Sequence, residues 1–94
     1  MTINLEESVK LSSKLRALAL YKFNKKVENN LTLGETIFNE IASIFTELAA
    51  IKPIKYLGPA SLGDQLAVAI SEILRTNSFI ENYQPQLRKI SNLI

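Results

Sequence analysis

The sequence predicts an all-α protein, an antiparallel four-helix bundle that forms a single domain over residues 1–94. Three observations predict this fold class. Apolar residues recur at steps of three and four in four segments, as on one face of a helix. Polar or proline-containing stretches separate these segments, and two of the segments begin with a capping box. Hydrophobic residues make up 47% of the chain, which is enough for a core and leaves some apolar surface for a partner.

The central helix is predicted from Thr32 to Ile51. Two phenylalanines widen its apolar seam to about half of the circumference, so this helix has to contact at least two neighbours. Thr32 and Glu35 form a capping box at its start. Pro53 ends it at Lys52, because proline disfavours helix in the residue before it. The seam consists of Ile37, Ile41, Ile44, Leu48 and Ile51.

A first helix is predicted from Leu5 to Phe23, and it begins with a capping box of Asn4 and Glu7. An extension of this helix to Val27 is the alternative. The expected core side contains Leu5, Val9, Leu11, Leu15, Leu18, Ala19 and Phe23, with Ser8 and Ser12 as small residues where another helix could approach.

A third helix is predicted after the irregular stretch 52–60, with Ser61 as its N-cap and Arg75 in its last turn. The side chain of Asp64 stands in its first turn, where the helix dipole favours an acid. Its core edge consists of Leu62, Leu66, Ile70 and Ile73, and the irregular stretch is expected to be fixed to the bundle by Ile54, Tyr56 and Leu57.

The start of the last helix has two solutions. Ser78 and Glu81 could form a capping box, but Pro85 would then lie inside the helix, where it costs about 3 kcal/mol. We prefer a short turn from Phe79 and a helix capped by Asn82, because this start places Pro85 in the first turn. The seam of this helix is Leu87, Ile90 and Ile94.

Several kinds of chemistry are excluded by composition. The chain has no histidine or cysteine, so a histidine-activated nucleophile and the usual zinc sites are impossible. Glu40 and Glu47 are the only aligned acids of the central helix, and we interpret them as part of a solvated face. The sequence therefore predicts no enzyme, no cofactor and no metal site. Without an apolar run of membrane-spanning length or a signal peptide, it also predicts a cytoplasmic protein.

Two groups of polar residues are candidates for recognition. A stripe on the first helix could bind phosphates or a membrane surface, but Glu7 and Glu28 share it, so we prefer a solvated face. The proline loop and the turn after the third helix are the second group, although lysine, arginine and turn residues also have structural uses there. The stripe is Lys10, Lys14, Tyr21 and Lys25, and the second group is Lys52, Lys55, Tyr56, Arg75, Asn77 and Ser78.

The second half of the chain has an ordered pattern: an apolar helix closed by proline, a leucine-spaced helix, a short polar turn and a final apolar helix. Its residues are Lys52-Pro53, then Leu62, Leu66 and Ile70-Ser71, then Arg75-Thr76-Asn77-Ser78, and then Leu87, Ile90 and Leu93. From about Glu47 to Ile94, this pattern resembles the immunity proteins of class II (pediocin-like) bacteriocins, of the enterocin A immunity type.

This resemblance implies a non-enzymatic cytosolic protein that protects a bacteriocin producer. It would act on the membrane receptor complex that the bacteriocin opens, through protein contacts and with a possible peripheral contact to the membrane. The discriminating surface of the family lies in its C-terminal half. Carried onto this chain, it points to Arg75, Asn77, Ser78, Arg88 and Lys89.

Two alternatives remain open at this stage. The first is a small DNA-binding or phage-type regulator, since the third helix and its turn can be aligned with a helix-turn-helix. The net charge of +2, the absence of a basic recognition helix and the lack of glycine between Asp64 and Asn82 do not favour it. The second is a homodimerisation module that uses the surplus apolar surface.

Overall fold

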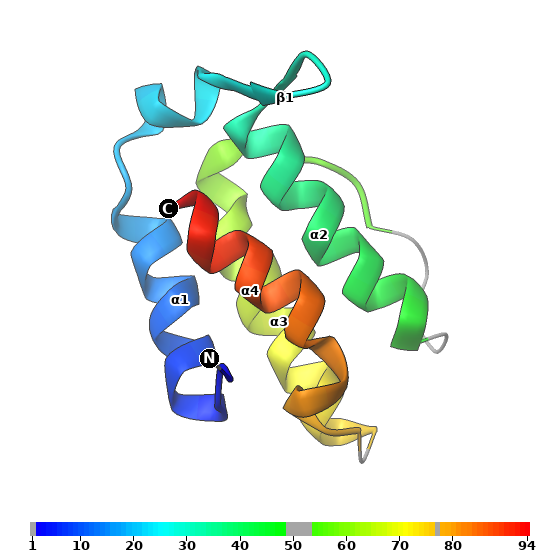
Figure 1. Cartoon of the computed structure of the whole chain (residues 1–94). Coiled ribbons are helices and arrows are strands. Elements are labelled where there is room, and N and C mark those ends of the chain that lie inside the picture. Colours follow the sequence, from blue (N-terminus) through cyan, green and yellow to red (C-terminus); the bar gives the residue numbers. More distant parts are fainter. Residues whose placement is uncertain (1, 49–53, 77) are drawn as a thin grey trace.

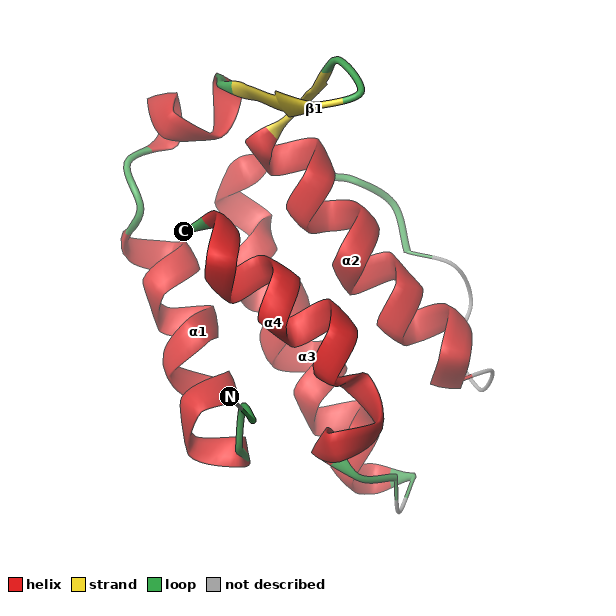
Figure 2. Cartoon of the chain, viewed as in Figure 1, coloured by secondary structure: helices red, strands yellow, loops and turns green. Residues whose placement is uncertain are grey.

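The computed structural model describes residues 2–48, 54–76 and 78–94, and these residues form an all-α four-helix bundle with one small hairpin. The fold class predicted from the sequence is confirmed. Figure 2 shows the helices in red and the hairpin in yellow beyond one end of the bundle. The four helices are α1 (Leu5–Ala17), α2 (Leu33–Leu48), α3 (Leu62–Arg75) and α4 (Gln84–Leu93).

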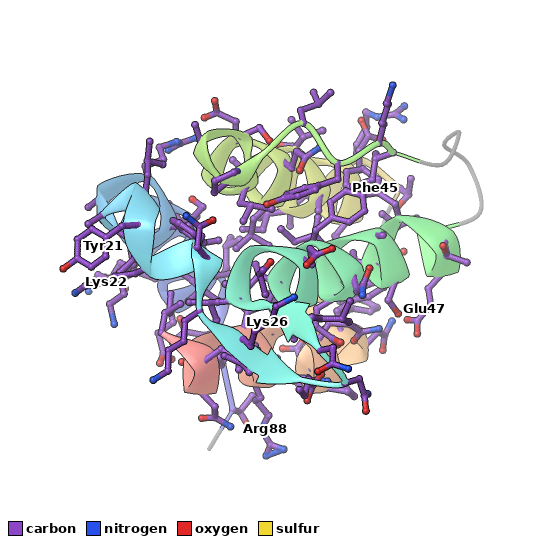
Figure 3. The ribbon with its side chains drawn as sticks, turned by 90° about the horizontal axis from the view of Figure 1, so that it is seen from above. Tyr21, Lys22, Lys26, Phe45, Glu47 and Arg88 are labelled. Carbon is purple, nitrogen blue, oxygen red and sulfur yellow. The ribbon has the colours of Figure 1, made fainter. Side chains whose placement is uncertain are left out.

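The segment before α3 determines how the helices are arranged. It runs back along α2: the ring of Tyr56 packs on Phe38 with centroids 5.2 Å apart, and Gln65 Nε2 donates to the carbonyl of Lys55 at 3.0 Å. Consequently α2 and α3 point in the same direction, whereas α1 and α4 point in the opposite one (Figure 1). Seen from above, α3 and α4 lie on opposite sides of the bundle, with α1 and α2 between them (Figure 3).

The core forms where the seams of the four helices meet. The predicted seam of α2 is buried from Ile37 to Leu48, while Ile51 lies outside the described residues. The capping box at its start is confirmed: the Glu35 backbone N–H donates to Thr32 Oγ1 at 3.2 Å, and Thr32 N–H donates to Glu35 Oε1 at 3.0 Å. The predicted core residues of the other helices that are also buried are Leu11, Leu15, Leu62, Leu66, Ile70, Ile73, Leu87 and Ile90.

The first helix ends earlier than predicted. It stops at Ala17, because the backbone of Leu18 is extended, and a short 3-10 helix, Leu20–Asn24, follows instead. This turn brings Phe23 back into the core, where it is 1% exposed. A continuous helix would have carried Phe23 beyond the end of the bundle. The predicted burial of Leu5 and Val9 is also wrong, since they are 41% and 50% exposed.

A two-stranded hairpin joins this region to α2, and the sequence analysis placed only a polar turn there. Strand β1 (Lys26–Glu28) pairs antiparallel with β2 (Leu31–Thr32). The two residues between the strands, Asn29 and Asn30, have φ of 47° and 61°. Asparagine tolerates this left-handed conformation, which a two-residue hairpin loop requires at both positions.

The starts of α3 and α4 differ in detail from the prediction. Ser61 does not cap α3, because its hydroxyl donates to the carbonyl of Gly58 at 2.7 Å. Asn82 does not cap α4 either: it belongs to a 3-10 turn, Ile80–Tyr83, that leads directly into the helix. The position of Pro85 in the first turn of α4 is confirmed. Of the outer residues, Leu57 is 70% exposed and Ile94 is 38% exposed, so neither is the core residue that was predicted.

The helices α1 and α3 approach each other closely. Ser8 and Ser12 are buried, which confirms that these small residues face a neighbouring helix. On α3, Gly63 lies against Ser12 and Arg16: a Cβ added there would be 2.8 Å from the carbonyl oxygen of Ser12. The absence of side-chain bulk on both helices thus sets the distance between them.

Candidate functional site

The structure describes two of the predicted recognition residues of the proline loop, and one of them is exposed while the other is packed against α2. Lys55 is exposed, whereas Tyr56 is partly buried on α2, with its ring against Phe38. Burial, and secondarily the nearby Glu35 carboxylate, raise the pKa of the Tyr56 phenol. Tyr56 therefore has a structural task in holding the loop to α2. Lys52 lies outside the described residues.

Two of the residues predicted in the turn between α3 and α4 are described: Arg75 lies at the surface and Ser78 is half-buried. Arg75 is exposed, and its Nε donates to Glu72 Oε2 at 3.0 Å. The hydroxyl of Thr76 donates to Ser78 Oγ at 3.2 Å, while Asn77 lies outside the described residues. Phe79, which the sequence analysis did not assign to a function, is 67% exposed beside them.

Lys89 holds parts of the fold together. Its Nζ lies 2.9 Å from Glu28 Oε1 in the hairpin and 3.5 Å from Glu40 Oε2 in α2. The hydrogen bond to Glu28 raises the pKa of Lys89, and the charges of both acids add to this effect. Glu40 is therefore not simply a solvated acid, as the sequence suggested, and Lys89 links three elements of the fold.

A basic surface forms where α1 and α4 lie side by side. A groove of about 300 Å³ lies between them, and Lys10, Lys14 and the acid Glu7 of α1 line it together with Ser91 of α4. A smaller groove of about 200 Å³ shares Ile3 and Ser91 with the first and adds Arg88. Arg88, which was predicted for another reason, thus lines a groove that adjoins the groove of the lysine stripe.

The same surface continues to the 3-10 helix at the other end of α1. A groove of about 500 Å³ is lined there by Tyr21, Lys22 and Lys25 together with Leu18 and apolar residues of α2 and the end of α4. Tyr21 and Lys22 project away from the bundle, and Tyr21 is 74% exposed (Figure 3). Next to it, Leu20 is 56% exposed. We call this region the basic surface; it consists of Lys10, Lys14, Leu20, Tyr21, Lys22, Lys25 and Arg88.

The charge of the basic surface is only partly compensated within the molecule. Residues 8–27 contain six lysines and arginines and no acid, and four of these cations, Lys10, Lys14, Lys22 and Lys25, belong to the basic surface. Lys10 pairs with Glu6 at 3.4 Å, but for Lys14, Lys22 and Lys25 we find no ion pair among the residues that the structure describes. A region of this kind attracts phosphates, anionic lipid headgroups or acidic proteins.

The sequence indicated only part of this surface. The stripe of the first helix was found by its spacing, but it was judged to be diluted by two acids. In the structure Glu28 is paired with Lys89 and no longer dilutes the stripe, whereas Glu7 lines the same groove as Lys10 and Lys14 and still dilutes it. Lys22 was missed, although the absence of acids between Glu7 and Glu28 was a signal in the sequence that could have identified it.

Comparisons of this chain with protein families, curated proteins and solved structures find no match. Within residues 2–48, 54–76 and 78–94, no helix combines the length and the apolar character needed to cross a membrane.

Proposed function

We propose that this chain is a bacteriocin-immunity-type protein, which protects its cell without catalysis by contacting the cytosolic side of a membrane receptor. The basic surface is the observation that carries this proposal. The cytosolic leaflet has a negative surface potential, and each lysine or arginine close to it contributes about 1 kcal/mol of attraction. Exposed Leu20 and Tyr21 at one end of the surface suit the boundary between headgroups and hydrocarbon.

In this proposal, the basic surface orients the protein against the membrane beside its receptor. The receptor itself is then contacted by residues at the edge of that surface, with Arg88 of α4 as the first candidate. This agrees with the resemblance, which points to the C-terminal half of the chain. The turn residues Arg75 and Ser78 remain predicted contacts on the same grounds.

The direct test is a protection assay. The chain is expressed in a bacteriocin-sensitive lactic acid bacterium, and the cells are challenged with a panel of class II bacteriocins. We expect resistance to one or a few members of the panel. Uniform sensitivity to a broad panel, with the protein abundant and folded in the cells, would contradict the proposal.

Charge reversals locate the surface in the same assay. We expect Lys14→Glu and Lys22→Glu each to reduce protection, because each places an acid on the basic surface. Lys55→Glu is the matched control: it changes the net charge by the same amount at an exposed residue of the proline loop. If Lys55→Glu abolishes protection while the other two variants retain it, the loop predicted from the sequence is the contact site.

A nucleic acid is the second candidate partner, because the same run of six cations without an acid would also attract phosphates. Fluorescence anisotropy with duplex DNA at increasing salt tests it. Affinity that falls steeply with salt in the wild type, and falls strongly in Lys14→Glu, would favour the regulator. Absence of binding at low salt would remove it.

A further inference from the structure

The outer side of α3 carries a row of exposed residues with the spacing of a helix–helix interface. Asp64, Val68, Ser71 and Arg75 follow one another at steps of 4, 3 and 4, and all four are exposed. These residues lie on the side of α3 opposite its buried seam. The apolar member of the row, Val68, is 52% exposed. A stripe with this spacing is what one helix presents to another across a seam.

Apolar grooves flank this row on both sides. One groove, of about 540 Å³, lies between α3, α2 and the segment before α3, and it is bordered by Leu57 and Val68. The other, of about 340 Å³, lies between α3 and α1. Among the described residues, half of the large hydrophobic side chains that are exposed border these two grooves. They are Leu5, Val9, Leu57, Val68 and Leu74.

The charges at the two ends of the row identify an occupant. Asp64 and Arg75 are separated by eleven residues, which is about 16 Å along a helix. If two copies of α3 pack antiparallel about a two-fold axis, Asp64 of each copy lies opposite Arg75 of the other, and Val68 lies opposite Ser71. A parallel arrangement would bring like charges together. We propose that α3 is the interface of a symmetric homodimer.

The neighbouring charges fit this arrangement. Each copy already pairs Asp64 with Arg16 at 2.8 Å and Arg75 with Glu72. In the antiparallel dimer, the Asp64–Arg16 pair of one copy lies beside the Arg75–Glu72 pair of the other. Two larger charge networks therefore form across the interface. The small side chains of Val68 and Ser71 allow the helix axes to approach to about 8–10 Å. Under two-fold symmetry each groove of one copy faces the same groove of the other copy. The exposed leucines that border the grooves are therefore buried in both copies.

The size and place of the interface are also compatible with a dimer. A stable interface takes about 800 Å² from each partner, about one seventh of the 5667 Å² surface of this chain. The grooves beside α3 share no lining residue with the grooves of the basic surface, so pairing through α3 leaves the basic surface accessible in both copies. The dimer would cover Arg75, which is also a predicted receptor contact. Variants of Val68 and of Lys14 each affect only one of the two surfaces, so the two proposals can still fail separately.

Analytical ultracentrifugation over a range of concentrations tests the interface. We expect the wild type to reach the mass of a dimer and Val68→Glu to remain a monomer with an unchanged circular dichroism spectrum. Leu20→Glu is the matched control, because it places the same charge at an equally exposed apolar residue of the 3-10 helix. A wild type that stays monomeric at the highest concentration would overturn the proposal.

Charge reversal tests the antiparallel geometry. Asp64→Arg and Arg75→Glu should each raise the dissociation constant of the dimer about tenfold, since every dimer contains two of the affected pairs. The double variant restores opposite charges across the two-fold axis, and we expect its dissociation constant to return close to that of the wild type. Within one copy the double variant leaves Arg16 and Glu72 facing like charges, so a recovery can arise only between copies. A double variant as weak as the two single variants combined would overturn the antiparallel arrangement.

Discussion

The close contact between α1 and α3 can be tested by adding one methyl group, in Gly63→Ala. The new Cβ would lie 2.8 Å from the carbonyl oxygen of Ser12 and 3.1 Å from the backbone nitrogen of Arg16. It would also lie 2.5 Å from Cγ of Arg16. Two of these atoms belong to the backbone of α1, so they cannot move unless the helix itself shifts.

Two opposing effects determine the size of the change. Replacing glycine by alanine in a helix contributes up to about 1 kcal/mol of stability. Overpacking costs about 1–3 kcal/mol, and we expect the upper part of this range because the obstacle is backbone. The net loss in the free energy of unfolding is then about 1–2 kcal/mol. For a domain of this size, that loss lowers the melting temperature by about 5–15 °C.

Gly34→Ala is the matched control for this experiment. Gly34 is buried and occupies the second position of α2, as Gly63 does in α3. Its added Cβ would meet the hydroxyl of Tyr56 at 2.6 Å, but this is the far end of a side chain that can move. We expect this variant to lie within about 1 kcal/mol of the wild type.

Thermal and urea denaturation, followed by circular dichroism, compare the two variants. The reasoning is refuted if Gly63→Ala melts at or above the temperature of the wild type. It is also refuted if the two alanine variants are destabilised equally, because rigid and movable obstacles would then have the same effect.

Two further predictions concern the core and the start of α2. Ile44→Asp should unfold the domain, because Ile44 is 0% exposed at the centre of the seam and the charge would have no partner there; a cooperative melt like that of the wild type would contradict the bundle. The backbone N–H and then the hydroxyl of Thr32 hold the pKa of Glu35 below 4.5. Because the pKa of Glu35 is lower in the folded state than in the unfolded state, its ionised side chain stabilises the fold at pH values above the unfolded-state pKa. This stabilisation is lost as the pH falls through the folded-state pKa. Wild type and Glu35→Gln should therefore differ in melting temperature at neutral pH and converge in acid, and a difference that does not change with pH would exclude this role.

Local signals accounted for most of the fold. The capping boxes at Asn4 and Thr32 and the seam of α2 depend on residues only a few positions apart, so their spacing predicted them correctly. The end of α1 was mispredicted because Leu18, Ala19 and Phe23 continue the helical spacing. The burial of Phe23 in the core outweighs that pattern, and the gain comes from contacts with segments distant in the sequence. The hairpin was missed because three- and two-residue strands are too short to show alternation.

The candidate surfaces depend on the arrangement of the helices, which local spacing does not encode. A simple up-and-down order would have made α2 and α3 antiparallel neighbours. Because the segment before α3 returns along α2, α3 runs in the same direction as α2, and α4 runs in the same direction as α1. The lysine stripe of α1 shares a groove with Ser91 of α4, and Arg88 lines the adjoining groove.

The same arrangement explains why two surfaces with different chemistry can coexist on so small a bundle. The contacts of α3 with α1 and α2 leave its outer row exposed, and the charges of that row have opposite sign at its two ends. Such a row complements a reversed copy of itself. The basic surface has charges of one sign and repels its own copy, so it requires an anionic partner. Val68 belongs only to the row on α3 and Lys14 only to the basic surface, so variants of these two residues should each leave the other surface intact. Self-association and protection can therefore be measured separately.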